Sequence, residues 1–249
     1  MKQIYKIFFL ALLLSVSAKP VQSQKSNPIP DQTQARITTE FIESRMYEAT
    51  KGINSNREIE GSPYFNENWE PGYFIKTNGK GTKKYPMRLN IYKNQLEFKF
   101  DENTIYVASP KPIKGFVLNA YNGSDLLFMK GFDIPNSDVS QKTFLEVLHD
   151  GKTKLLVHHS CKFNEGHSKD MFTGKFTDRY VSTSNYYLMN ATGQFEQVKL
   201  REKDILKTLE SRGDELKAFI DQKDLNLKKE EDVITFLVEY DRRLSITSD

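Results

Sequence analysis

The sequence predicts an α+β protein in which a mainly antiparallel sheet, as a meander, an open roll or a barrel-like sheet, precedes a small C-terminal helical unit. Two observations support this fold class. Between residues 61 and 200, short segments in which apolar and polar residues alternate are separated by turn-forming residues. After Leu200 the apolar residues recur at helical spacing, and no proline follows Pro135.

The first 23 residues are typical of a cleavable secretory signal peptide. A cationic start precedes an apolar run over residues 7–16. This run is shorter than the roughly 20 residues that a membrane-spanning helix needs. We expect cleavage after Ser23, because the alternative cut after Ala18 would leave Lys19-Pro20 beside it. The expected location is periplasmic or secreted, and the sequence leaves that choice open.

Removing the signal peptide changes the charge of the chain. The segment contains three of the 36 Lys and Arg residues and none of the 33 Asp and Glu residues, so the mature chain is near neutral. Overall charge therefore gives no support to nucleic-acid binding, and we predict no nucleic-acid partner. We also expect no membrane span in the mature chain. With Cys161 as its one cysteine, the chain has neither an internal disulfide nor a lipid-accepting thiol near the cut.

Residues 24–60 are predicted to be a flexible leader that contains a possible helix. Residues 24–35 are polar and include two prolines, whereas residues 36–50 carry Ile37, Phe41 and Ile42 at helical spacing. The antiparallel β domain is expected to span residues 61–200.

The β domain begins with turn-forming residues that lead into a strand near 72–77. Met87, Leu89 and Ile91 then alternate with polar residues, and a second alternating run follows a tight turn at Lys93-Asn94. A later hairpin surrounds Asp150-Gly151, a dipeptide suited to positive φ angles. The pattern predicts roughly nine strands, the later ones near residues 105–107, 115–118, 126–129, 143–148, 153–159, 180–189 and 195–200.

Residues 201–249 are predicted to form the helical unit. Three apolar groups recur at helical spacing: Ile205, Leu206 and Leu209; Leu216, Phe219 and Ile220; Val233, Phe236, Leu237 and Tyr240. A capping box over residues 211–214 would begin the middle helix. Each helix has one apolar side, which must pack on the sheet, on the other helices or on a partner.

One cluster of residues has the chemistry of a metal or thiol site. His159, Cys161 and His167 are close in sequence, and imidazoles with a thiol suit a soft divalent ion. Strand alternation places His159 and Cys161 on one face and His158 on the other. The simpler interpretation is a buried Cys161, a hydrogen-bonded His159 and an exposed His158. We likewise expect His149 to be an exposed neighbour of its turn.

Signatures of known catalytic sites are absent from the sequence. Gly-x-Ser-x-Gly, His-Glu-x-x-His and Gly-x-Gly-x-x-Gly do not occur, and no cofactor is predicted. Glu97, Glu102 and Glu146 could pair across strands, as carboxylates do in many charged β proteins. A hydrolase, or a thiol- or metal-dependent enzyme that uses Cys161 and a nearby histidine, is the alternative hypothesis.

The aromatic residues near the start of the β domain suggest a binding surface. The candidate residues are Tyr64, Trp69, Tyr73, Arg88 and Tyr92. Exposed aromatic side chains bind sugars and peptides, although such residues also close the end of a sheet core. The leading hypothesis is therefore a non-enzymatic binding or structural module of the cell envelope, with an envelope protein or a glycan as its partner.

Three segments resemble an uncharacterised family of exported proteins common in Bacteroidota. They are residues 61–66 (GSPYFN), residues 86–92 (PMRLNIY) with Glu97-Phe98, and the closing pair of helices. The resemblance implies a secreted or periplasmic β-rich protein with no assigned activity. It supplies no catalytic residues.

Overall fold

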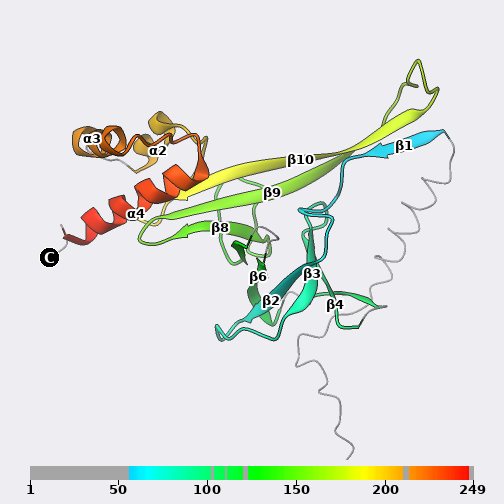
Figure 1. The fold of residues 1–249 in the computed structure, drawn as a ribbon, viewed down its shortest axis with the longest axis horizontal. Coiled ribbons are helices and arrows are strands. Elements are labelled where there is room, and N and C mark those ends of the chain that lie inside the picture. The colour runs from blue at the N-terminus through cyan, green and yellow to red at the C-terminus, as the bar shows by residue number, and fades with distance from the viewer. Residues whose placement is uncertain (1–55, 102–103, 110, 120–122, 210–212, 247–249) are drawn as a thin grey trace, which may run out of the picture. The chain divides into compact units, whose positions relative to one another are not determined.

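The computed structural model describes residues 56–101, 104–109, 111–119, 123–209 and 213–246. This part of the chain forms one mixed sheet of eleven strands, with three helices at its C-terminal end (Figure 1). The predicted α+β class is confirmed. The sheet is open, because its strand order begins at β1 and ends at β5, in the sequence β1-β10-β9-β8-β7-β6-β2-β3-β4-β5, with β11 paired to β10. The signal peptide and the possible helix at residues 36–50 lie outside the described residues.

The strands follow one another through short connections along most of the chain. They are β1 (Arg57–Glu60), β2 (Glu70–Lys76), β3 (Tyr85–Asn90), β4 (Gln95–Lys99), β5 (Ile105–Val107), β6 (Ile113–Asn119), β7 (Asp125–Met129), β8 (Leu145–Asp150), β9 (Lys154–Asn164), β10 (Phe176–Met189) and β11 (Phe195–Val198). Every pair in the sheet is antiparallel except β1 with β10, which is parallel.

Strand β1 occupies residues that the sequence analysis places in the leader. Its sequence, Arg-Glu-Ile-Glu, has too little apolar character to predict a strand. Charged side chains hold it against β10 instead: Arg57 pairs with the buried Asp178, Glu60 with Arg179, and Glu58 with Lys175 of the preceding loop.

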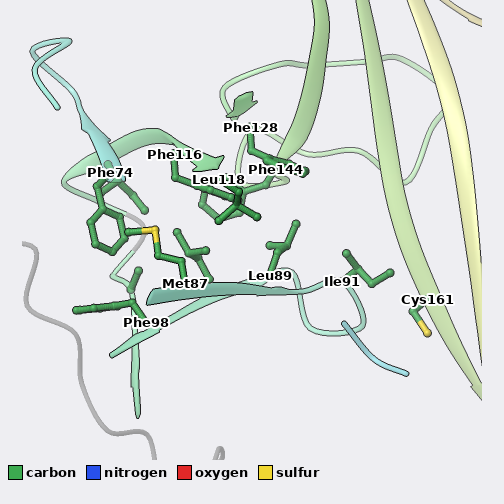
Figure 2. Close-up of a cluster of buried hydrophobic side chains, with 13 residues drawn as sticks. Phe74, Met87, Leu89, Ile91, Phe98, Phe116, Leu118, Phe128, Phe144 and Cys161 are labelled. Carbon is green, nitrogen blue, oxygen red and sulfur yellow. The ribbon is translucent and has the colours of Figure 1, made fainter. Parts of the chain in front are cut away.

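The first core lies on one face of β2, β3, β4 and β6. Phe74, Met87, Leu89, Phe98 and Phe116 converge there, as Figure 2 shows. The β3–β4 hairpin is confirmed. Its register pairs Asn90 with Gln95, so four residues rather than two connect the strands, and Asn94 adopts φ 51°. This register fixes which side chains of the two strands face each other.

The β8–β9 hairpin is also confirmed, but its glycine serves a different purpose from the predicted one. Neither Asp150 nor Gly151 adopts a positive φ. A Cβ atom at Gly151 would instead overlap the carboxylate of Asp241. The glycine is needed because the chain passes close to helix α4, and the turn geometry itself does not require it.

The helices are α2 (Glu202–Thr208), α3 (Gly213–Lys223) and α4 (Glu230–Ile246). Their apolar sides form a second core with Leu155 and Leu188 of the sheet, and the members from the helices include Ile205, Leu216, Ile220, Val233, Phe236 and Leu237. The predicted capping box falls partly outside the described residues. Among the helices that are described, none combines the length and the apolar character needed to cross a membrane.

Candidate functional site

A buried ion pair lies on the face of β3 and β4 that is opposite the first core. Alternation along β3 directs Met87 and Leu89 into that core and leaves Arg88 on the other face. The register places Arg88 directly across from Glu97. Arg88 Nη2 donates to Glu97 Oε2 over 2.7 Å, and the side chains are 7% and 0% exposed. The two charges therefore neutralise each other away from solvent.

Two aromatic rings cover the guanidinium group of Arg88. Residues 63–65 run along β3, where the Phe65 N–H donates to the Leu89 carbonyl over 2.9 Å, and this places Tyr64 on the same face as Arg88. The Arg88 guanidinium carbon lies 3.6 Å from the centre of the Tyr64 ring and 4.5 Å from that of Trp69. The Tyr64 hydroxyl also donates to Glu97 Oε1 over 3.3 Å. The cation is thus enclosed by a carboxylate and two aromatic faces.

A second cation contacts the same indole. Lys99 lies two residues beyond Glu97 on β4, and its Nζ is 4.7 Å from the centre of the Trp69 ring. Among the described residues, Lys99 has no carboxylate partner, whereas Arg88 is neutralised by Glu97. We call Tyr64, Trp69, Arg88, Glu97 and Lys99 the Trp69 surface. It combines a half-buried indole with the Lys99 ammonium group, which no carboxylate neutralises in the part of the chain that the structure describes.

The structure brings together three of the five predicted binding residues, Tyr64, Trp69 and Arg88. The other two lie elsewhere. Tyr73 packs against the turn at Gly81, and Tyr92 is 45% exposed and meets Tyr180 edge-on, with 5.6 Å between ring centres.

Sequence reasoning did not assign Glu97 and Lys99 to this site. The alternation of polar and apolar residues along β4 could have identified them. Glu97 and Lys99 alternate with Leu96 and Phe98, just as Arg88 alternates with Met87 and Leu89 on β3. Recognising the site also requires the register between the two strands.

The predicted metal or thiol residues do not converge. Cys161 is buried, its Sγ is 3.7 Å from the Ser62 carbonyl oxygen, and burial raises the pKa of its thiol. His167 is exposed in the loop that follows β9. No group of three or more His, Cys, Asp or Glu side chains suited to a metal ion occurs within the described ranges.

His159 belongs to a different network. Its Nε2 lies 2.7 Å from Glu146 Oε2, its Nδ1 lies 2.9 Å from Ser184 Oγ, and its ring packs edge-on against Phe65. Both ring nitrogens are therefore already engaged. A hydroxyl, an imidazole and a carboxylate in this order can transfer a proton, as in acyl-transfer enzymes. Ser184, however, lies in the middle of a paired strand, and oxyanion-binding N–H groups are usually supplied by loops or helix N-termini.

Two other histidines differ from the expectation of exposed side chains. His149 Nε2 lies 2.8 Å from Asp241 Oδ2, and the His149 side chain is only 11% exposed because α4 packs against the β8–β9 turn. His158 is half-buried on the opposite face of β9 from His159, and this burial lowers its pKa. Neither contributes to the Trp69 surface.

The chain was also compared with known proteins. No family model, no curated protein and no solved structure matches it. An inference about function therefore depends on the residues of this chain alone.

Proposed function

We propose that the protein is an exported, non-enzymatic binding module of the bacterial cell envelope, and that its Trp69 surface binds an acidic glycan. The signal-like first 23 residues support export. The observation that carries the binding proposal is the half-buried Trp69 indole with Lys99 Nζ 4.7 Å from its centre. An aromatic ring beside a cation matches a sugar ring that carries a carboxylate, such as a uronic acid.

The ion pair beneath this surface explains why Lys99 would determine the charge preference. Glu97 neutralises Arg88, and Tyr64 and Trp69 shield the Arg88 guanidinium group. Arg88 therefore positions the indole, while the Lys99 ammonium group is left to meet an anion. A single site of this kind binds weakly, and a polymeric glycan offers it many equivalent repeats to occupy.

The alternative hypothesis of a thiol- or metal-dependent enzyme has less support. The Cys161 thiol is buried, and burial raises its pKa, which reduces the thiolate that would attack a substrate. Both nitrogens of the neighbouring His159 already have partners in Glu146 and Ser184.

The test measures binding to the mature chain by titration calorimetry. The ligands are polygalacturonate and, as a neutral counterpart, methyl-esterified polygalacturonate. We expect the acidic polymer to bind, the esterified polymer to bind at least several-fold more weakly, and Lys99→Gln to remove most of this difference. Trp69→Ala should abolish binding. If that variant does not fold, Trp69→Phe should retain binding with reduced affinity.

Lys83→Gln is the matched control. The Lys83 ammonium group also lies over aromatic rings, 5.3 Å from the centre of Tyr85 and 5.0 Å from that of Phe100. Tyr85, however, packs against the first core and therefore lies on the other face of β3 from Arg88. Equal losses in Lys83→Gln and Lys99→Gln, or no preference for the acidic polymer, would show that the Trp69 surface is not the site.

A further inference from the structure

The β9–β10 hairpin extends beyond β8, the strand that pairs with the other edge of β9. Strand β8 pairs with β9 only as far as Val157, whereas β9 and β10 remain paired as far as Asn164 and Arg179. Figure 1 shows these two long strands and the loop that joins them. We call residues 165–175 the hairpin tip. It carries Met171 and Phe172, whose exposed fractions are 96% and 98%. These are the two most exposed large apolar residues in the described part of the chain.

Hydrogen bonds within the hairpin tip hold these two side chains outward. Asp170 Oδ1 accepts from the backbone N–H groups of Phe172 and Thr173 over 2.9 and 2.8 Å. The Asp170 N–H donates to the Lys175 carbonyl, the Gly174 N–H donates to the Asp170 carbonyl, and Gly174 adopts φ 67°. The N–H groups of Thr173 and Phe172 also lower the pKa of Asp170, which keeps its carboxylate ionised and bonded within the turn. The apolar pair is therefore presented by a defined turn.

One lysine beside the apolar pair, Lys169, has no carboxylate partner among the described residues, and its Nζ lies 5.7 Å from the centre of the Phe176 ring. Lys175, on the other side of the turn, is paired with Glu58 of β1, and the carboxylate of Asp170 bonds to backbone N–H groups. Apolar side chains at the apex with a cation behind them match the layering of a phospholipid surface, in which acyl chains lie beneath anionic headgroups.

We propose that the hairpin tip docks onto a phospholipid surface, with Met171 and Phe172 in the acyl region and Lys169 at the headgroup phosphates. A convex apex with two apolar side chains can enter a fluid bilayer without a preformed pocket. Two side chains alone give only marginal membrane affinity, and Lys169 supplies the second attraction that such docking requires. Association is therefore reversible and weakens as salt concentration rises.

The experiment measures partitioning of the mature chain onto vesicles of phosphatidylethanolamine and phosphatidylglycerol, with vesicles of phosphatidylcholine alone for comparison. We expect Phe172→Ser to reduce the partition coefficient by about tenfold, which is the scale of losing one buried aromatic side chain. Lys169→Gln should reduce binding to the anionic vesicles only. Soluble glycerol phosphate should not compete, because it supplies a headgroup without an acyl region. In the variant Phe172→Trp, binding to vesicles should add a blue-shifted tryptophan fluorescence, and brominated lipids should quench it.

Val238→Ser is the matched control, because Val238 is 56% exposed but lies on α4. It should leave partitioning unchanged. The proposal is wrong if Val238→Ser and Phe172→Ser have equal effects, or if glycerol phosphate displaces the protein. It is also wrong if the wild-type chain does not partition onto anionic vesicles. Sedimentation without vesicles provides a further check, since a Phe172-dependent dimer would assign the hairpin tip to self-association.

Discussion

Glu97→Gln is the substitution from which we expect the largest loss of stability at the Trp69 surface. Glu97 is fully buried, and it is the countercharge of Arg88, which is itself 7% exposed. Glutamine keeps the size of the side chain and an acceptor for Tyr64, but it leaves the guanidinium charge without compensation. Removing one partner of a buried pair costs about 3–5 kcal/mol, which is a large part of the stability of a typical domain.

The reciprocal variant Arg88→Met leaves the buried Glu97 carboxylate without its countercharge, so it should lose stability as well. In the double variant Arg88→Met/Glu97→Leu neither charge remains, and we expect a free energy of unfolding within about 1 kcal/mol of wild type.

The assay is equilibrium unfolding in urea, followed by two probes. Trp69 is the single tryptophan, so its fluorescence reports on this surface directly, while far-ultraviolet circular dichroism reports on the whole sheet. A loss below about 1 kcal/mol in Glu97→Gln would refute the reasoning, because the charge would then have to be solvated. A double variant as unstable as Glu97→Gln would refute it too, since packing would outweigh charge.

Three further predictions concern other regions. Burial raises the pKa of the Cys161 thiol, so a thiol reagent should modify it slowly in the native protein and rapidly in urea, and fast native modification would contradict the burial. Gly151→Ala should lower the free energy of unfolding by about 1–3 kcal/mol, because the added Cβ atom would clash with Asp241. Thermal unfolding measures this loss, and the control Lys152→Ala, in the same turn, should not show it. Burial and, second to it, the hydrogen bond to Glu230 raise the pKa of Tyr186. The folded state therefore retains this phenolic proton at pH values at which the unfolded chain loses it. Stability should therefore fall as pH rises above about 10, and Tyr186→Phe should reduce that slope.

The strand pattern was predictable from sequence, but the register that builds the site was not. Alternation from Met87 onward identifies which residues of β3 face the core, and this identifies Arg88 as lying on the opposite face. A two-residue turn at Lys93-Asn94 would pair Arg88 with Lys99, a like-charge contact. The structure uses a four-residue connection and pairs Arg88 with Glu97. Turn length thus decided the partner, and alternation alone carries no information about turn length.

Contacts between distant parts of the chain were beyond the sequence patterns. His149 and Asp241 are 92 residues apart, and only the packing of α4 against the β8–β9 turn brings them together. The strand character of residues 57–60 was hidden for a similar reason, because its stabilising partners, Asp178 and Arg179, lie far along the chain. Local periodicity reports burial on one element and cannot identify the element that covers it.

The parallel pairing of β1 with β10 has a consequence for the order of folding. Glu60 and Arg179 are 119 residues apart, whereas only residues 165–175 separate β9 from β10. The hairpin can therefore form early, and β1 joins it only after a long loop has closed. Until then, the outer edge of β10 at residues 176–179 is an unpaired template for another chain. A strand of four residues with three charges seals that edge and is itself a poor template, so β1 protects the folded hairpin from edge-to-edge aggregation.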